Sequence, residues 1–321
     1  MSVGMADAPF HADVADAPAD ARTHWITTSD GLRLRAVTWA AGERGTAVIF
    51  PGRTEFAEKY GRVAGRLVER GLSVAVIDWR GQGLSDRPPD NPMRGHVEDF
   101  RDYQRDVAAL LDLVDGLGLP GPRTLVAHSM GGCIGLRALL ERADFAAAVF
   151  SAPMWHLQMR AATRELTARF TQLAYMMGFG MRLMPGTRDR PTALAVDFEA
   201  NALTTDRDTF AWCVNQIATY PELSLGGPSM QWTRAALEEM ARLYIAPLPN
   251  LPVLALLGSE ESVVSSSVVR TQIAQMAQGS LLDLPGARHE VFMERPEILD
   301  RLWSGIDAFL EAPGRGRAAT G

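Results

Sequence analysis

TLVAHSMGGC, residues 124–133, joins a short apolar run to a tight turn of small residues, and a helix-forming segment, 134–141, follows it. This order predicts a nucleophile elbow, a sharp strand-to-helix turn that holds the Ser129 hydroxyl away from the backbone. The chain passes close to itself at such a turn, so neighbouring residues must be small; Gly131 meets this need, and Ala127 stands where glycine is usual. Because short patterns also occur by chance in Gly-rich turns, the prediction depends on the strand and helix that flank the serine.

The composition is that of a globular protein. Of the 321 residues, 47% are hydrophobic and 22% charged, enough to bury a sizeable core in one large or two small domains. The net charge of −6 gives no reason to expect nucleic-acid binding, and Lys59 is the only lysine. The two cysteines and six histidines show no spacing typical of disulfide frameworks or metal sites, so no metal or organic cofactor is implied.

Both ends of the chain are predicted to be disordered. Residues 1–22 are rich in Ala, Asp and Pro and lack the basic region and apolar core of a secretory signal, so they are interpreted as a disordered leader. Residues 312–321 are interpreted as a disordered tail. No stretch approaches the roughly 18–20 apolar residues that a transmembrane helix needs. These features favour a cytoplasmic location.

Apolar strands alternate with helical segments through most of the chain. Residues 25–28 and 32–39 flank Asp30-Gly31 and predict an antiparallel hairpin at one edge of a sheet. Further strands are predicted at 47–50, 73–78, 124–127, 146–151, 253–257 and 281–284, and helices at 58–70, 99–113, 134–141, 266–276 and 297–310. Because these strands are continuous apolar runs, we expect an α/β fold with a mostly parallel sheet and helices on both faces.

The alternation is interrupted after the sixth predicted strand. Residues 154–247 are helix-like and contain no clear strand, which predicts a helical cap inserted into the α/β core. The core then consists of two parts, 23–153 and 248–311, on either side of the cap.

The serine hydroxyl needs a general base, which α/β folds place in a loop at the carboxyl end of a strand. His289 fits this role because it follows the strand 281–284 in a turn and precedes the last helix. His128 is the rival, but it adjoins the serine in sequence, so its side chain should leave the elbow in a different direction. A helix-capping or surface role for His289 is the simpler alternative, and the elbow favours the catalytic role.

An acid is expected to orient the base. The turn GSEESVV, residues 258–264, follows the next-to-last predicted strand, and a carboxylate there can reach His289. Glu261 is preferred to Glu260 because it stands two residues before the apolar Val263, although paired glutamates in a loop are usually solvated. The turn after the sixth strand offers no carboxylate.

Two backbone N–H groups should stabilise the oxyanion that forms when the serine attacks a carbonyl. Met130, the residue after the nucleophile, supplies one of them. The second is expected from Arg53, in the loop after the strand 47–50, where Gly52 lets the backbone approach closely. The Arg53 side chain could bind a phosphate or point to solvent, and the sequence favours neither.

Four motifs occur in an order that resembles the α/β-hydrolase superfamily. They are PGRTE at 51–55 followed by Lys59-Tyr60, DWRGQGLS at 78–85, HSMGG at 128–132, and His289-Glu290. With the order Ser, Glu, His, they make residues 25–310 similar to the lysophospholipase and monoacylglycerol lipase group. The sequence departs from many members in two places: Pro51-Gly52 replaces His-Gly, which looks closer to the bacterial lysophospholipase L2 type, and Glu261 replaces aspartate.

The insertion corresponds to the cap of this group and is rich in methionine. It contains eight of the fourteen methionines, namely Met154, Met159, Met176, Met177, Met181, Met184, Met230 and Met240. Flexible methionines suit an acyl chain that enters over the serine, although an ordinary helical core explains any one of them. Met154, Trp155 and Arg53 are predicted to contact substrate. Residues 160–184 also form a candidate amphipathic surface for a membrane, which would hold the protein at the inner membrane.

The resemblance implies a serine esterase that acts on single-chain lipids. Lysophospholipid is the first expected substrate, and monoacylglycerol or a short generic ester is the alternative. A dehalogenase or epoxide hydrolase is disfavoured because it needs a carboxylate at the elbow, where this chain has Ser129. A non-catalytic ligand-binding protein on the same fold is the alternative from another class, and the candidate triad argues against it.

Overall fold

The computed structural model describes residues 8–142, 144–191 and 196–312. Within these residues one sheet has the strand order β1-β2-β4-β3-β5-β6-β7-β8. The strands are β1 (Arg22–Thr27), β2 (Arg33–Trp39), β3 (Thr46–Phe50), β4 (Ser73–Ile77), β5 (Arg123–His128), β6 (Ala147–Ser151), β7 (Val253–Gly258) and β8 (Gly279–Leu284). β2 is antiparallel to β1 and β4, and the remaining neighbours are parallel. The predicted hairpin and mostly parallel sheet are confirmed.

The central strands are apolar throughout because both of their faces are covered. Every residue of β3, β4, β6 and β7 is buried. Successive side chains point to opposite faces of a sheet, so Val48 and Phe50 join one core cluster while Ala47 and Ile49 join the other. A continuous apolar run is therefore the pattern that this position in the sheet requires.

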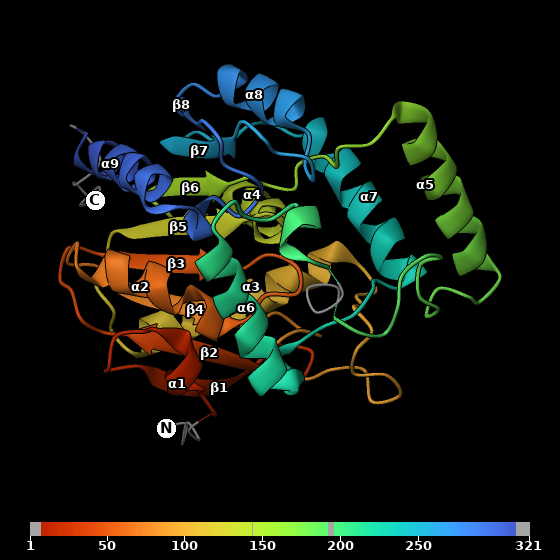
Figure 1. Cartoon of the computed structure of the whole chain (residues 1–321), viewed down its shortest axis with the longest axis horizontal. Helices are drawn as coiled ribbons and strands as arrows, with labels where there is room; N and C mark the ends of the chain where they lie inside the picture. The colour runs from red at the N-terminus through yellow and green to blue at the C-terminus, as the bar shows by residue number, and fades with distance from the viewer. Residues whose placement is uncertain (1–7, 143, 192–195, 313–321) are drawn as a thin grey trace.

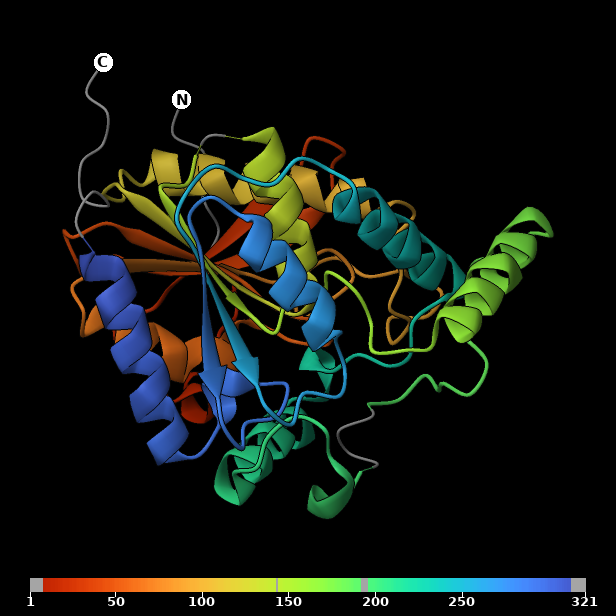
Figure 2. The same ribbon diagram turned by 90° about the horizontal axis from the view of Figure 1, so that it is seen from above.

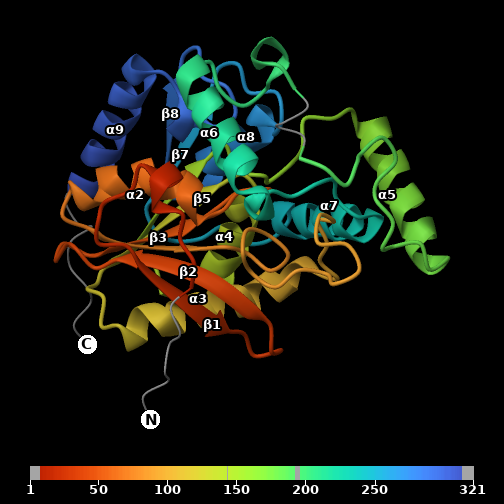
Figure 3. The ribbon, with the colours of Figure 1, turned by 60° about the horizontal axis from the view of Figure 1, so that its bottom comes forward.

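Helices cover the two faces of the sheet in separate layers (Figure 3). The helices of the core are α2 (Gly61–Val68), which continues the 3₁₀ turn η1 (Ala57–Tyr60), α3 (Tyr103–Gly116), preceded by η2 (Phe100–Asp102), α4 (Met130–Glu141), α8 (Ser266–Gln275) and α9 (Pro296–Glu311), preceded by η5 (Val291–Met293). Buried residues of α3, α4 and α8 belong to one core cluster, and those of α2 and α9 belong to the other. The α/β prediction with helices on both faces is thus confirmed.

The helical insertion lies between β6 and β7, as predicted. It contains α5 (Ala161–Met176), α6 (Arg207–Thr219) and α7 (Met230–Tyr244), with short 3₁₀ turns η3 (Phe198–Ala200) and η4 (Pro221–Leu223). Figures 1 and 2 show α5 at the outer end of the molecule, beyond α7 and away from the sheet. Trp232, Ala235 and Ala236 of α7 pack into the same cluster as α4. The insertion thus shares a hydrophobic core with the α/β part of the chain. The division into a core and a separate cap domain at residues 154–247 stays a prediction. None of the described helices combines the length and apolar character required to span a bilayer.

The disordered leader is wrong for residues 8–22, which pack against the body of the protein. A short helix, α1 (Ala12–Ala15), buries Val14 and Ala15. The Val14 carbonyl accepts hydrogen bonds from Trp212 and Gln216, both at 2.9 Å, and the Pro18 carbonyl accepts one from Trp39 at 3.1 Å. The composition of this segment predicts disorder because it does not show that backbone carbonyls of the segment accept hydrogen bonds from side chains elsewhere in the chain. Residues 1–7 and 313–321 lie outside the described residues.

Removal of residues 1–20 is expected to lower the thermal stability. The buried donors on Trp39, Trp212 and Gln216 would lose their acceptors, at a cost of about 1–3 kcal/mol for each group that water cannot reach. With an unfolding entropy of about 2.1 cal/mol/K per residue, 1 kcal/mol corresponds to about 1.5 °C in a chain of 321 residues, so two or three such losses should lower the melting temperature by roughly 3–14 °C. Asp20→Ala, at an exposed position of the same segment, is the control. A truncated protein that melts within about 1 °C of the full chain would contradict this role for the segment.

Candidate active site

Ser129 occupies a strained turn between β5 and α4. Its φ of +48° and ψ of −114° lie in a region that non-glycine residues rarely adopt. The Ser129 N–H donates to the Ser151 carbonyl at 3.0 Å, and the Ser129 carbonyl accepts from the N–H groups of Gly132 and Met154, both at 2.8 Å. The end of β6 and the start of α4 thus hold the turn in place, and the predicted elbow is confirmed in its geometry.

Small residues are required where this turn meets its neighbours. A Cβ on Gly131 would lie 2.0 Å from the Phe50 carbonyl oxygen, so only glycine fits there. Ala127 replaces the usual glycine of the motif, and its side chain is fully buried. A Cβ on Gly135 would lie 3.3 Å from the Ala127 Cβ. Because residue 135 is a glycine, there is room for the methyl group of Ala127.

The structure brings Ser129, His289 and Glu261 into one chain of hydrogen bonds. His289 Nε2 lies 2.9 Å from Ser129 Oγ, and His289 Nδ1 lies 2.7 Å from Glu261 Oε2. Ser129 and His289 are buried, which limits competition from water. An imidazole between a hydroxyl and a carboxylate can take the hydroxyl proton while the carboxylate stabilises the resulting imidazolium.

Glu261 is held in the form that this arrangement needs. Burial alone would raise the pKa of its carboxyl, but the hydrogen bond with His289 and those from the Val263 and Val264 N–H groups lower it. These two N–H groups donate to Oε1 at 2.5 and 3.1 Å, which leaves Oε2 for the histidine. The neighbouring Glu260 is exposed and lies 3.7 Å from Arg288. Of the two glutamates, Glu261 is the one that contacts the histidine, and its role as the acid stays a prediction.

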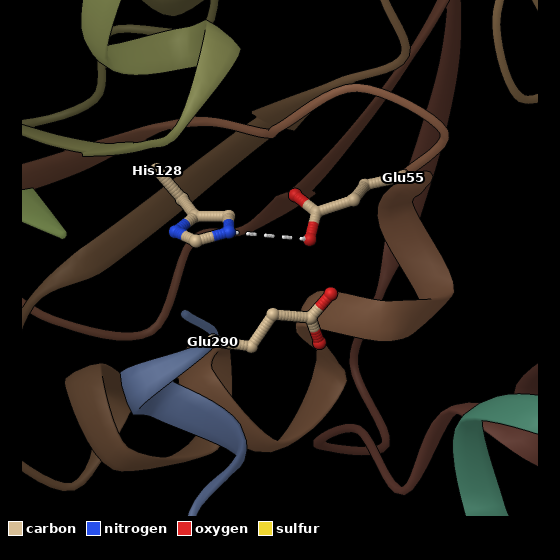
Figure 4. A group of neighbouring side chains, drawn as sticks. All are labelled: Glu55, His128 and Glu290. Atoms are coloured by element: carbon tan, nitrogen blue, oxygen red, sulfur yellow. Dashed lines mark ion pairs between the residues drawn. The ribbon is translucent and has the colours of Figure 1, made fainter. Parts of the chain in front are cut away.

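His128, the rival base, lies in a buried polar cluster with Glu55 and Glu290 (Figure 4). Its Nδ1 lies 3.0 Å from Ser151 Oγ, and its Nε2 lies 3.7 Å from Glu55 Oε1. Burial lowers the pKa of its imidazole, and Glu55 opposes this shift. Its ring centroid lies 4.9 Å from that of His289, beside the catalytic candidate rather than in its place.

Glu55, His128 and Glu290 could together offer three ligands to a metal ion. Lys59 already neutralises both carboxylates, because its ammonium lies 2.8 Å from Glu55 and 2.6 Å from Glu290. Burial would raise the pKa of Glu55, but Lys59 and His128 bring it down to about 2, while Glu290 and Glu55 raise the pKa of Lys59 against the effect of burial. A metal would have to displace a buried ammonium that both carboxylates stabilise, so the cluster does not fit a metal site.

The loop after β3 lies beside the elbow because β3 and β5 are parallel neighbours, with Phe50 opposite Ala127. This loop carries Arg53. Among the described residues, no group accepts a hydrogen bond from the backbone N–H of Arg53 or of Met130. Both predicted oxyanion donors are therefore free to bind a ligand.

The Arg53 side chain is directed into the protein. Its Nη2 donates to the Gly226 carbonyl at 2.6 Å, and its guanidinium lies 5.2 Å from the ring centroid of Trp232. Its buried Nε has no hydrogen-bond partner, and no carboxylate among the described residues pairs with the guanidinium. Burial lowers the pKa of this side chain to about 10, so it is still a cation at neutral pH. Of the two alternatives for Arg53, orientation into open solvent is excluded.

Arg53 and Thr54 line a cavity of about 350 Å³ beneath the insertion. Its apolar walls come from the insertion: Val196, Ala202, Leu203, Phe210, Ile217 and Leu225. The carbonyls of Ala202 and Leu203 also accept hydrogen bonds from the N–H groups of His289 and Glu290, at 3.4 and 2.8 Å, so the cavity adjoins the loop of the base. These wall residues were not predicted; their apolar spacing between residues 196 and 225 is the only sequence signal for them.

Met154 and Trp155 lie in the core beside the elbow and do not line this cavity. The Trp155 indole donates to the Gly132 carbonyl at 3.1 Å and packs edge-on against Phe150 at 5.1 Å. Both residues are buried and support the turn from behind. The prediction that they contact substrate does not fit this placement.

The chain is similar to known proteins over most of its length. A family model described as Hydrolase_4, serine aminopeptidase, S33, covers residues 41–296. The chain belongs to the Hydrolase_4 family. It is 29% identical to lysophospholipase L2 of Escherichia coli strain K12 over 290 residues, which cover 84% of this chain and 82% of that protein. It is 25% identical to monoacylglycerol lipase of Mycolicibacterium smegmatis over 304 residues, covering 89% and 97% of the two chains.

The fold of this Hydrolase_4 member is shared with solved lipase structures. A soluble variant of monoglyceride lipase from Saccharomyces cerevisiae, in complex with a substrate analogue, superposes with a TM-score of 0.70 at 19% identity. The match covers 89% of this chain and 94% of that one. The predicted α/β-hydrolase fold is confirmed, and the chain is a carboxylic ester hydrolase.

Glu261→Gln is expected to lower kcat by about 10³- to 10⁴-fold on any ester substrate, because a neutral amide cannot stabilise the imidazolium and no longer selects the correct tautomer. Glu260→Gln, the same change at the neighbouring exposed position, should leave kcat within about twofold of wild type. Initial rates on a p-nitrophenyl ester measure both. A larger loss in the Glu260 variant than in the Glu261 variant would show that the acid has been assigned to the wrong residue.

Proposed function

We propose that this ester hydrolase cleaves the acyl ester of single-chain lipids, with lysophospholipids as its preferred substrates. The observation that carries the proposal is the hydrogen-bond chain from Ser129 Oγ through His289 to Glu261. Arg53 adds a second element, because it lies both in the predicted oxyanion loop and in the wall of an apolar cavity.

The reaction proceeds in two stages through an acyl-enzyme. Ser129 Oγ attacks the ester carbonyl while His289 Nε2 takes its proton, and Glu261 stabilises the imidazolium. The N–H groups of Arg53 and Met130 hold the oxyanion of the tetrahedral intermediate. His289 then returns the proton to the leaving alcohol. In the second stage water attacks the acyl-serine with His289 as base, which releases the fatty acid.

A lysophospholipid fits the two kinds of surface that meet at Arg53. The acyl chain suits the apolar walls from the insertion, where burial of each methylene contributes about 0.8 kcal/mol. The phosphate suits the Arg53 guanidinium, which has no carboxylate partner among the described residues. Similarity to a protein named lysophospholipase L2 supports the same substrate class.

Two other substrate classes are less well matched. A monoacylglycerol has the same acyl chain but offers no anion to Arg53, so it is the runner-up, and similarity to a protein named monoacylglycerol lipase supports it. A peptide with a free amino terminus, as the family description suggests, would need a carboxylate near the reacting bond. The described residues that line the cavity include no Asp or Glu.

We further propose that α5 contacts the lipid surface from which the substrate comes. Leu166, Phe170, Leu173 and Met177 recur at the spacing of one helical face and are exposed, Leu166 to 69%. Met176, which adjoins Met177, is exposed to 72%. Monomeric proteins rarely leave such a row of large apolar side chains in water. Arg160 and Arg164 begin the same segment, which suits anionic lipid and would hold the protein peripherally at the inner membrane.

Arg53→Met should separate the two lipid substrates. It keeps the backbone N–H and removes the cation, so kcat/KM for lysophosphatidylcholine should fall by about 10- to 100-fold, the equivalent of one charge-assisted hydrogen bond. The value for monooleoylglycerol should change by less than about threefold. Ser129→Ala, with a fluorophosphonate probe, is the control that activity arises at this serine. Equal losses on both lipids would contradict phosphate recognition, and a wild-type protein that the probe does not label would contradict the enzyme assignment.

Leu173→Glu should weaken binding to vesicles of phosphatidylglycerol and phosphatidylcholine by about tenfold or more, since a buried leucine side chain contributes about 1.5–3 kcal/mol. Gln172→Glu introduces the same charge at the adjacent exposed position, off the apolar face, and is the matched control. Co-sedimentation with the vesicles measures both. Equal binding by the two variants would contradict the proposal, and a concentration-dependent dimer of the wild type in the absence of lipid would assign the face to a second copy of the chain.

A further inference from the structure

Gln82, in the turn after β4, uses both polar atoms of its side-chain amide to bind the loop after β3 that carries Arg53. Its Nε2 donates to the Gly52 carbonyl at 3.2 Å, and its Oε1 accepts from the Thr54 N–H at 2.8 Å. The side chain is 3% exposed. The two contacts lie on either side of Arg53, so one amide grips the residues before and after the predicted oxyanion donor.

The grip on Gly52 determines where the Arg53 N–H points. In a planar trans peptide, the C=O of one residue and the N–H of the next point in opposite directions. Gln82 binds the Gly52 C=O, and the Arg53 N–H of the same peptide must therefore face away from Gln82. That N–H has no acceptor among the described residues. Rotation of this peptide would turn the donor away from the oxyanion.

The loop needs such support because its backbone is strained. Thr54 has a φ of +67°, in the left-handed region that favours glycine. A carboxylate oxygen of Glu55 accepts from the Gly52 N–H, which restrains the peptide on the other side of Gly52. Gln82 is the residue that restrains both the Gly52–Arg53 and the Arg53–Thr54 peptides.

Gln82 is itself fixed within a rigid turn. Its N–H donates to the Trp79 carbonyl at 2.9 Å, and its carbonyl accepts from the Ser85 N–H at 3.1 Å. The Ser85 hydroxyl donates to the Asp78 carbonyl at 2.6 Å, which closes the turn onto the end of β4. The orientation of the Gly52–Arg53 peptide is thus transmitted from the sheet through a single buried amide.

We propose that Gln82 is a positioning residue for the oxyanion hole, which orients the Arg53 N–H without touching substrate. The inference rests on the proposed function, because it takes Arg53 as an oxyanion donor. Loss of one such donor costs about 10²- to 10³-fold in kcat. Loss of its orientation should affect the transition state far more than the ground state, because the donor meets full negative charge only after the serine attacks.

Two variants of Gln82 and one control test this. Gln82→Glu keeps the length and the acceptor for the Thr54 N–H but loses the donor to Gly52, and Gln82→Leu loses both. The control is Gln104→Leu, at another buried glutamine whose amide donates to a backbone carbonyl, that of Ile134 at 3.1 Å, within the core. Active sites are counted by fluorophosphonate labelling run to completion. The measured quantities are kcat and KM on a p-nitrophenyl ester and the inhibition constant of an alkyl trifluoromethyl ketone.

Both Gln82 variants should lose about 10- to 10³-fold in kcat per labelled site with KM changed less than about threefold, and the ketone should bind weaker by a similar factor. Gln104→Leu should lower the melting temperature but keep kcat per site. If the Gln82 variants turn over within about twofold of wild type per site, or lose rate with no change in ketone affinity, the positioning role is wrong. Absence of labelling in the wild type would instead overturn the proposed function. Should Gln82→Leu fail to fold, Gln82→Glu decides the question alone.

Discussion

The left-handed backbone of Ser129 is the constraint on which the site depends. A serine adopts this conformation at a cost of about 1–3 kcal/mol, so the surrounding structure must supply the difference. Part of it comes from two hydrogen bonds: the Ser129 N–H donates to the Ser151 carbonyl at the end of β6, and the Met154 N–H, just after β6, donates to the Ser129 carbonyl. The contact of Gly131 with the Phe50 carbonyl adds the end of β3. The candidate nucleophile is therefore held in this conformation by contacts with three neighbouring parallel strands, β3, β5 and β6.

The three residues of the candidate triad could be brought together from the sequence because each follows a strand in a parallel sheet. The carboxyl ends of parallel strands meet at one edge, so Ser129, Glu261 and His289, although far apart in the chain, had to lie close together. The preference for Glu261 over Glu260 could also be based on sequence, because Glu261 stands two residues before the apolar Val263. In the structure the N–H groups of Val263 and Val264 bind the Glu261 carboxylate. Short-range pattern and strand order were enough for these residues.

The rest of the site depends on contacts that no local pattern reveals. Disorder was predicted for residues 8–22 because the side-chain pattern does not show that backbone carbonyls of this segment accept hydrogen bonds from Trp39 and Trp212. Trp155 has the composition of a substrate contact but faces the core, where its indole binds the Gly132 carbonyl. The cavity walls come from the weakly patterned part of the insertion, and the Gln82 amide acts across a turn. Such pairings are settled only when distant segments pack.

The burial of Lys59 between Glu55 and Glu290 affects how the folded protein reacts with reagents that attack amines. Lys59 is the only lysine in the chain, and it is 7% exposed between two carboxylates. Every other basic side chain apart from histidine is an arginine, which holds its proton at any physiological pH and is a poor nucleophile. The folded protein thus displays almost no side-chain amine to acylating or aldehyde reagents. Lys59 can react only when the cluster that it forms with Glu55 and Glu290 opens to solvent. Its modification therefore measures that opening.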